Sequence, residues 1–478
     1  MVTALSEEGK QGCEEALVSA RTLLEQSLFH HEGVPVGTRA AVDGRLAADN
    51  YRQCFVRDFF VSALVFLSDG HHQVVRNFLA AVLDLCHEEK TLAGHERRPG
   101  VMPASFHLVE DEDGNERLVA DFGDRAIGRV APVDSMMWWI ILLYCYVRVT
   151  DDRDFVTEER VQTAIREMVD LCLKDSFEIF PTLLVPDGSF MIDRRLGVYG
   201  HPIEIQALFY GMLQAARDLL AKTEANQSLR AVMLKRQQAL RSYIRIFYWL
   251  DLDRLNEIHR FDTEQFGTGT VNMLNIYPES IPEWVGEWLP DGTGYLVGNL
   301  GPGRMDFRVF TMGNLLAILF DLATPDQAQC IMELFEQKWD DLMGLMPVKI
   351  CYPAIEGERW RLQTGCDPKN VPWSYHNGGN WPVLLWAFVA GAVKSGRQDL
   401  ARRACRMAAG RLVRDRWPEY YDGRSGRLIG RRANHGQVWS AAALLFADRI
   451  LQDAQVLCMF PGQPVAIQCL ADGDNPAA

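Results

Sequence analysis

Apolar residues recur at three- to four-residue intervals along most of this chain, whereas the strict alternation that indicates β-strands is rare. This periodicity predicts about twelve α-helices, most of them arranged as adjacent pairs. The predicted helices cover residues 10–32, 55–69, 73–90, 134–150, 154–174, 201–222, 225–249, 307–322, 325–340, 381–396, 398–414 and 436–452. A mostly helical fold is therefore expected.

Long segments rich in Gly, Pro and aromatic residues separate these pairs, at 91–133, 175–200, 250–306, 341–380 and 415–435. Loops of this length in a compact domain usually carry function. Helical pairs separated by such loops predict a closed ring of helical hairpins, an all-α (α/α)6 barrel whose long loops form a pocket at one end. A helical protein of two domains is the alternative, but no linker or repeat favours a boundary. We expect one domain over residues 1–478, with its core at about 50–452 and short terminal extensions.

The charge and cysteine patterns exclude several classes of function. The net charge of −14 argues against nucleic acid and anionic membranes as partners. The 11 cysteines are scattered and never form CxxC, so neither a zinc site nor a redox pair is predicted. The longest apolar run, residues 136–147, is too short to span a bilayer, and the N-terminus lacks the apolar core of a signal peptide. These features predict a soluble, cytoplasmic protein without a metal.

The long loops share an unusual mixture of carboxylates, arginines, amides and aromatic residues. Aromatic faces stack on the C–H faces of sugars, while carboxylates, amides and arginines bind sugar hydroxyls. Each residue alone has an ordinary structural explanation, but the same mixture recurs in at least five loops. The mixture includes Arg57-Asp58, Asp193-Arg194-Arg195, His201, Glu204, Gln206, Glu283-Trp284, Asp306, His376-Asn377 and Trp417-Pro418-Glu419. This repetition favours a carbohydrate pocket.

Hydrolysis of a glycosidic bond requires two carboxyl groups, one acting as an acid and the other as a base or a nucleophile. Asp193 and Glu419 are the candidates, because each lies in a dense polar and aromatic loop. A salt bridge from Asp193 to Arg194 or Arg195 is the structural alternative for the first. For Glu419 the alternative is a loop acid packed on Tyr420.

Several long motifs together resemble one family. They include FVRDFFVSALVFL, GRVAPVDSMMWWIILL, GSFMIDRRLGVYGHPIEIQALFY, WVGEWLPDGTGYLVGNLGPGRMDFRVFTMGN, DPKNVPWSYHNGGNWPVLLW and WPEYYDGRSGRLIG. From about residue 50 to 450 the chain is similar to the alkaline/neutral invertases of glycoside hydrolase family 100. The resemblance implies an (α/α)6 barrel that hydrolyses sucrose to glucose and fructose with inversion and without a cofactor. It also suggests a homo-oligomer, with a hexamer as the candidate form.

The resemblance assigns roles to particular residues of this chain. Asp193, in MIDRR, corresponds to the general acid, and Glu419, in WPEYYD, corresponds to the base that activates water. The family pattern also implies a pocket lined by Arg57, Asp58, Asp134, Trp139, His201, Glu204, Gln206, Glu283, Trp284, Asp306, Trp381 and Gln437, and Arg194 is expected to hold a sugar hydroxyl. The two arginines next to Asp193 should lower its pKa, so their orientation decides whether it can hold a proton.

The chain departs from the family pattern after GRLIG. The family commonly continues Lys-x-Ala-Arg, whereas this chain has Arg431-Arg432-Ala433-Asn434, followed by His435 and Gly436. An arginine that could contact substrate is thus replaced by Asn434, which affects specificity or efficiency rather than reaction class. Two alternatives stay open: a glycosidase for another disaccharide, and a sugar-binding protein without turnover.

Overall fold

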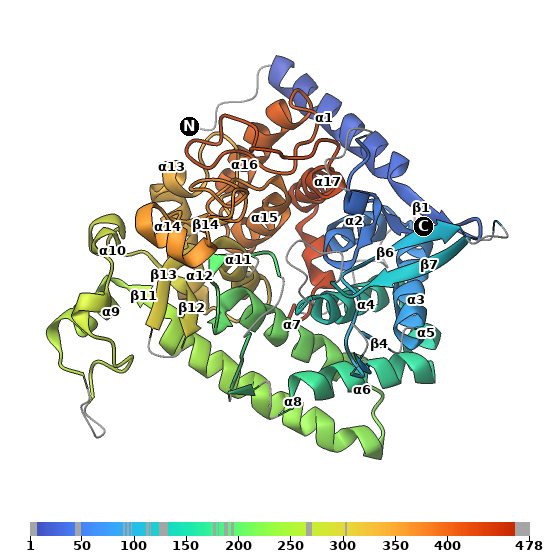
Figure 1. Ribbon diagram of the computed structural model, residues 1–478, viewed down its shortest axis with the longest axis horizontal. Helices are drawn as coiled ribbons and strands as arrows, with labels where there is room; N and C mark the ends of the chain where they lie inside the picture. Colours follow the sequence, from blue (N-terminus) through green and yellow to red (C-terminus); the bar gives the residue numbers. More distant parts are fainter. Residues whose placement is uncertain are drawn as a thin grey trace, which may run out of the picture.

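The structure is a computed structural model that describes residues 7–43, 49–88, 91–92, 95–96, 98–110, 114, 116–123, 132–174, 178–179, 181–185, 190–192, 196–263, 270–301 and 304–463. The predicted mostly helical fold is confirmed (Figure 1). Asp193, Arg194 and Arg195 lie outside the described residues.

In the described part of the chain, six helices form an inner ring. They are α2 (Val56–Ser68), α4 (Ser135–Thr150), α7 (Ile203–Leu219), α11 (Thr311–Leu319), α15 (Leu385–Lys394) and α17 (Val438–Gln452). Each contacts the next in this order, and α17 contacts α2, so the ring closes (Figure 1). Their sequences are apolar on nearly every face, as in SMMWWIILLYCYV of α4, because neighbouring helices cover them on all sides.

A second set of helices packs outside this ring. They are α1 (Glu7–Gln26), α3 (His72–Glu88), α6 (Glu159–Cys172), α8 (Glu224–Tyr243), α12 (Pro325–Gln337) and α16 (Gln398–Leu412). These helices are amphipathic and bury one face on the ring; in α6 the buried residues include Val161, Ile165 and Met168. All twelve predicted helices therefore have counterparts, although several boundaries differ.

The boundaries differ mainly where a strand adjoins a helix. The predicted helix 10–32 ends at Gln26 and is followed by strands β1 (Leu28–His31) and β2 (Val34–Thr38). The first residues of the predicted helix 307–322 belong to strand β13 (Arg304–Phe310). The prediction for 154–174 corresponds to two helices, α5 (Arg153–Thr157) and α6.

The all-α prediction missed the strands of the long loops. An antiparallel sheet of five strands contains β10 (His201–Pro202), β11 (Trp249–Asp251), β12 (Gly294–Gly301), β13 and β14 (Cys351–Tyr352). A second sheet pairs β3 (Cys54–Phe55), β6 (Ser105–Glu110) and β7 (Glu116–Asp121). The remaining hairpins are β1–β2, β4 (Thr91–Leu92) with β5 (His95–Glu96), and β8 (Glu178–Ile179) with β9 (Thr182–Leu183).

Strand β12 was not predicted because it contains several glycines, and packing requires glycine at Gly294 and Gly298. A Cβ on Gly294 would lie 2.4 Å from the Trp249 ring, and one on Gly298 would lie 2.7 Å from Phe310. Glycine in a strand often marks such close approaches, but in a sequence it is typical of a loop. Tertiary contacts therefore produced a strand where composition predicted none.

Short helices also lie between the longer ones. They are α9 (Leu252–Arg260), α10 (Glu283–Trp288), α13 (Trp339–Leu342) and α14 (Gly357–Thr364), the 3-10 helices Asp49–Arg52, Pro278–Ser280, Pro382–Leu384 and Ala454–Met459, and a π-helical turn at Ile244–Tyr248. Figure 1 shows α9 and α10 projecting from one side of the ring.

The inner helices run in the same direction, so their first turns meet at one end of the ring. Arg57, in the first turn of α2, binds Asp134, which directly precedes α4. At the other end, Lys394 of α15 donates to the carbonyl of Leu319 of α11. Phe460, from the segment that follows α17, stacks on Trp386 in the first turn of α15, with centroids 6.0 Å apart, and both rings are buried. The interior of the ring is thus filled by apolar side chains, and the end with the first turns carries polar groups.

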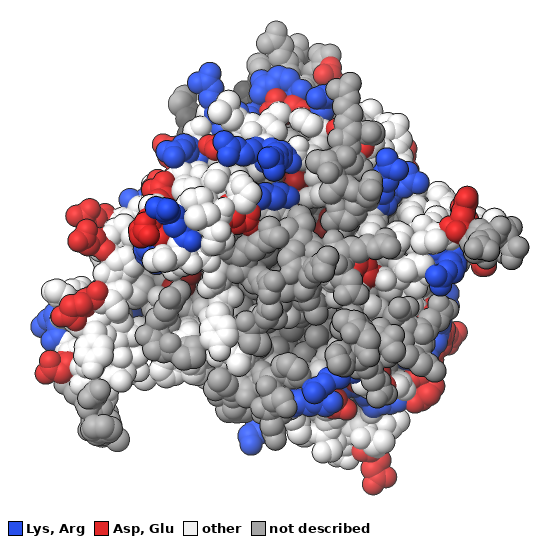
Figure 2. Space-filling view, viewed as in Figure 1, with Lys and Arg blue, Asp and Glu red and all other residues white. Residues whose placement is uncertain are grey.

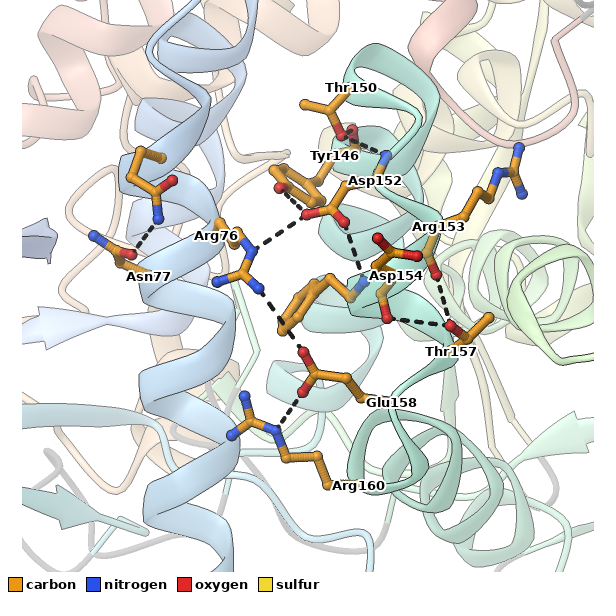
Figure 3. A network of polar contacts seen from close by, with 12 residues as sticks. Arg76, Asn77, Tyr146, Thr150, Asp152, Arg153, Asp154, Thr157, Glu158 and Arg160 are labelled. Atoms are coloured by element: carbon orange, nitrogen blue, oxygen red, sulfur yellow. Dashed lines mark hydrogen bonds and ion pairs between the residues drawn. The ribbon is translucent and has the colours of Figure 1, made fainter.

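A polar network joins outer helix α3 to the turn between α4 and α6 (Figure 3). Asp152 caps α5 by accepting from the N–H of Phe155 at 3.1 Å, and it also accepts from the Tyr146 hydroxyl at 2.6 Å. Arg76 of α3 donates to Asp152 at 3.2 Å and approaches Glu158 at 3.8 Å. Burial alone would raise the pKa of Asp152, but these hydrogen bonds lower it.

Candidate active site

The first turns of α2, α4 and α7 bring four charged side chains together. Arg57 binds Asp134 with two hydrogen bonds, from Nε to Oδ2 at 2.5 Å and from Nη2 to Oδ1 at 2.9 Å. The indole Nε1 of Trp138 also donates to Asp134, at 3.1 Å. Because Asp134 is fully buried, this bidentate pair compensates a carboxylate that has lost its water.

Two further carboxyl groups in this cluster have raised pKa values. Burial raises the pKa of Asp58 to about 7; Arg57 opposes the shift, and the nearby charges of Glu419 and Asp134 add to it. Burial and Asp134 raise the pKa of Glu204 to about 8, while Arg57 and the Met191 N–H oppose the shift. Near neutral pH a large fraction of both groups is protonated, so each can donate as well as accept a hydrogen bond.

Glu419 lies at the same end of the ring and is 2% exposed. The hydroxyl of Tyr51 donates to its Oε1 at 2.6 Å. The backbone N–H and the side-chain amide of Asn434 approach Oε2, each at 3.4 Å. Burial, followed by the neighbouring charge of Glu419, raises the pKa of Tyr51 well above its usual value, so Tyr51 stays a donor. One oxygen of Glu419 is thus firmly held, and the other has only long contacts.

A cluster of aromatic residues packs beside Glu419. Trp381 stacks on Tyr420 with centroids 5.4 Å apart, and its indole donates to the Tyr375 carbonyl at 3.0 Å. The ammonium of Lys369 lies 3.8 Å from the centroid of the Tyr375 ring and donates to the Tyr51 hydroxyl at 3.5 Å. These contacts fix the aromatic planes and place a positive charge beside the Tyr51–Glu419 pair.

Several polar atoms at this end are buried and have no hydrogen-bond partner among the described residues. They are Glu204 Oε2, Thr311 Oγ1, Asn380 Oδ1, His201 Nδ1 and both side-chain polar atoms of Gln437. Buried polar groups in folded proteins are nearly always hydrogen-bonded, and an unpaired one costs about 1–3 kcal/mol. Glu204, Thr311 and Gln437 lie at the starts of α7, α11 and α17, so three of the six inner helices contribute such an atom. A polar ligand with several hydroxyl groups would satisfy them.

Some of the predicted pocket residues have structural partners instead. Trp139 is fully buried and donates its indole N–H to the Leu79 carbonyl of α3, so the structure does not bring it into the cluster. Trp138, its neighbour, contacts Asp134. Gln206 uses both atoms of its amide to bind the backbone of Leu183, which anchors β9 against α7.

The predicted residues His201, Asp306, Glu283 and Trp284 lie in or beside the five-stranded sheet. His201 is buried in β10, and burial lowers its pKa, so the neutral form is favoured. Asp306 forms an ion pair with Arg308 at 2.5 Å; burial alone would raise its pKa, but Arg308 lowers it. Glu283 is exposed at the start of α10, and Trp284 packs edge-to-face on Tyr352. Within the described part of the chain, neither Glu283 nor Trp284 makes a direct contact with Glu419.

The structure also adds residues that the sequence did not single out. Tyr51 contacts Glu419, and Lys369 contacts Tyr51, although Tyr51 and Glu419 are 368 residues apart in the chain. Thr311 contributes a buried hydroxyl without a partner in the described chain. Tyr51 and Lys369 lie in loops and Thr311 lies at the start of a helix, and no motif in the sequence marks these three residues as functional.

Within the described residues, no group of three or more His, Cys, Asp or Glu side chains is arranged to hold a metal ion. No helix in the same set is both long enough and apolar enough to cross a membrane.

Comparisons with known proteins show what the chain is similar to. A model of the family described as alkaline and neutral invertase matches residues 20–454. The chain is 48% identical to alkaline/neutral invertase C, mitochondrial, of Arabidopsis thaliana over 91% of its own length and 66% of that protein. It is 49% identical to cytosolic invertase 1 of Oryza sativa subsp. japonica, over 91% of this chain and 78% of the relative.

Solved structures show the same fold at low sequence identity. A wild-type glycosidase has a TM-score of 0.56 and 14% identity, covering 96% of this chain and 100% of the other. A bacterial glucoamylase in complex with acarbose has a TM-score of 0.54 and 12% identity, covering 95% of this chain and 58% of the other. At these identities the likeness concerns the fold alone.

Proposed function

Because this chain belongs to the alkaline and neutral invertase family of glycoside hydrolases, we propose that it hydrolyses sucrose to glucose and fructose with inversion. The observation that carries the proposal is the family match over residues 20–454, within which Glu419 lies buried at the polar end of the helical ring. The fold proposed with it is a single-domain (α/α)6 barrel whose long loops form the substrate pocket.

Glu419 is proposed as the base that activates water. Its Oε1 is occupied by the strong hydrogen bond from Tyr51, whereas Oε2 has only two contacts of 3.4 Å. Oε2 is therefore the oxygen proposed to accept the water proton. The Tyr51 hydrogen bond keeps the carboxylate plane fixed, so that the attacking water is held in one orientation.

Asp193 is proposed as the acid that protonates the bridging oxygen of the glycosidic bond. It lies outside the described residues, and its assignment rests on the family motif MIDRR. Met191, two residues before Asp193 in the sequence, donates its N–H to Glu204 at 3.0 Å, so Met191 is bound to the polar end of the ring. For an inverting enzyme the two carboxyl groups should be about 6.5–9.5 Å apart, which leaves room for water.

The remaining polar groups are proposed to bind sugar hydroxyls. Asp58 and Glu204 can donate or accept near neutral pH, because their pKa values are about 7 and about 8. The unpaired atoms of Thr311, Asn380 and Gln437 would each gain a partner from a hydroxyl. The roles predicted for Arg57, Asp134, His201, Asp306, Trp381 and Arg194 remain part of this proposal.

The cytoplasmic location and the homo-oligomeric state, with a hexamer as the candidate form, are proposed on the same family grounds. The names of the relatives include both a cytosolic and a mitochondrial protein, so the location differs within the family. Light scattering after size-exclusion chromatography measures the mass in solution against the 54.1 kDa of one chain.

Proton NMR of a fresh sucrose reaction tests the main proposal. The expected result is release of glucose and fructose, with glucose first appearing as the β-anomer because the α-linkage is inverted. Glu419→Gln should abolish this signal without loss of the fold. Hydrolysis rates measured on sucrose, trehalose, maltose and raffinose distinguish a sucrose hydrolase from a glycosidase for another disaccharide. Binding of sucrose without product release would instead indicate a sugar-binding protein.

A further inference from the structure

Two adjoining cavities lie at the end of the ring opposite to the candidate active site. One, of about 270 Å³, lies between the last turns of α4 and α7, and the other, of about 380 Å³, lies between α7 and α8. Both are lined by Gln214, Arg217 and Gly462, so they are contiguous. Arg217 follows Glu204 by thirteen residues on α7, which places these cavities about 20 Å from the candidate active site.

The lining is strongly positive, although the whole chain is acidic. It contains five arginines and two aspartates: Arg148, Arg153, Arg217, Arg241, Arg245, Asp218 and Asp321. Arg217 donates from Nη1 to Gln237 Oε1 at 2.8 Å and has a distant ion pair with Asp218, at 3.5 Å. The side chain of Arg241 is exposed and makes no hydrogen bond or ion pair with any other described residue. The cavities therefore hold more positive charge than their own carboxylates neutralise.

Arginines near helix ends commonly bind terminal carbonyl groups, and two of the five arginines that line the cavities do so. Arg148 donates to the Cys458 carbonyl at 3.1 Å, and Arg245 donates to the Leu322 carbonyl at 2.7 Å. This role does not account for Arg241. Burial and then the charge of Arg241 lower the pKa of Arg245, so two guanidinium groups lie close together. An anion bound between them would relieve this repulsion.

The same cavities contain a buried amide with an unused acceptor. Gln214 is 7% exposed; its Nε2 donates to the Phe320 carbonyl at 3.4 Å, but its Oε1 has no partner among the described residues. Gly462, with φ of +84°, crosses directly over this amide, and a Cβ there would lie 2.9 Å from Gln214 Nε2. The amide is thus held between the two cavities, where a ligand hydroxyl could donate to it. Water could also donate to Oε1, but it would not balance the charge.

We propose that the two cavities form one binding site for a phosphorylated sugar of hexose monophosphate size. The phosphate oxygens bind Arg241 and Arg217, since guanidinium groups match the geometry of phosphate, and a sugar hydroxyl donates to Gln214 Oε1. Cavities of a few hundred cubic ångströms suit a ligand of this size. The inference does not rest on the proposed function, because no residue of the candidate active site takes part.

Isothermal titration calorimetry of the full chain tests this site. Glucose 6-phosphate and inorganic phosphate are titrated separately, with excess glucose present to occupy the candidate active site. Both should bind, and glucose 6-phosphate should bind about tenfold more tightly because of the Gln214 contact. Arg241→Ala should weaken both ligands about tenfold, whereas Gln214→Leu should remove only the difference between them.

Arg402→Ala is the matched control, because Arg402 is an exposed arginine of α16 that does not line either cavity. It should leave both affinities unchanged. The proposal is overturned if neither ligand binds or raises Tm at millimolar concentration. It is also overturned if Arg241→Ala and Arg402→Ala weaken binding equally. Equal affinity of the wild-type chain for the two ligands would overturn the sugar part of the proposal. Arg241 is exposed, so its variant should fold even if the Gln214 variant does not.

Discussion

The hydroxyl of Tyr51 donates to Oε1 of Glu419 at 2.6 Å, joining two residues that are 368 positions apart in the chain. Tyr51 belongs to the turn before α2, and Glu419 belongs to the loop before α17. Because α17 contacts α2, this hydrogen bond lies where the helical ring closes. The position of the proposed base thus depends on ring closure.

Tyr51→Phe removes this hydrogen bond while keeping the ring. A hydrogen bond to a charged group contributes about 1.5–3 kcal/mol, so we expect kcat for sucrose to fall about 10- to 100-fold. KM should change much less, because Tyr51 acts through Glu419. Tyr277→Phe, at an exposed tyrosine, is the control. Wild-type kcat in Tyr51→Phe would exclude this positioning role.

Asn434→Ala removes the side-chain amide near Oε2 of Glu419 but leaves the backbone N–H in place. Since both contacts are long, at 3.4 Å, we expect kcat to fall only about twofold. Steady-state kinetics of this variant beside Tyr51→Phe give the order of the two effects. A larger loss in Asn434→Ala than in Tyr51→Phe would reverse our assignment of the two oxygens of Glu419.

Asp58→Asn should change how stability depends on pH. The pKa of Asp58 is about 7 in the folded chain and about 3.9 in an unfolded one, so between these values the folded state binds more protons. Stability is therefore lost as pH rises from about 4 to about 7, and the neutral asparagine removes this loss. The Tm of Asp58→Asn minus that of the wild type should be larger at pH 8 than at pH 5. Asp253→Asn, at an exposed acid of α9, should give the same difference at both pH values.

Arg57→Ala leaves the carboxylate of Asp134 buried without its bidentate partner. Breaking a buried ion pair in this way costs about 3–5 kcal/mol, so the urea midpoint of unfolding should fall markedly. Arg57→Lys should be intermediate, because an ammonium group cannot reproduce the two parallel hydrogen bonds. If the midpoint of Arg57→Ala equals that of the wild type, the pair does not stabilise the fold.

Asp152→Ala tests a polar network far from the candidate active site (Figure 3). The variant loses the N-cap of α5 and the bonds from Tyr146 and Arg76, so we expect a loss of about 1–2 kcal/mol in the free energy of unfolding. The kcat for sucrose should stay within about twofold of the wild-type value. A large loss of kcat at a temperature where the variant is folded would contradict this separation.

Positive and negative side chains are mixed on the face seen in Figure 2, where lysine and arginine lie next to aspartate and glutamate around the edge. On the described part of this face, the net charge of −14 is therefore not gathered into one acidic field.

The sequence by itself determined the helices, because the apolar period of each segment reports which of its faces is buried. The continuous apolar run of α4 and the one-sided pattern of α6 distinguish an inner from an outer helix before any contact is known. The long motifs around Glu419 likewise identified the family. These signals are local, so a sequence carries them directly.

Only the tertiary structure decided which polar residues meet. Trp138 and Trp139 are adjacent in sequence, yet one binds Asp134 and the other binds the backbone of α3, because a helix turns 100° per residue. Tyr51 was not predicted, since its partner is distant in the chain. In the sequence, the glycines of β12 are typical of a loop. Only the packing shows that the rings of Trp249 and Phe310 occupy the space where side chains at Gly294 and Gly298 would lie. Distances between remote residues are set by how the ring closes, and no local pattern records them.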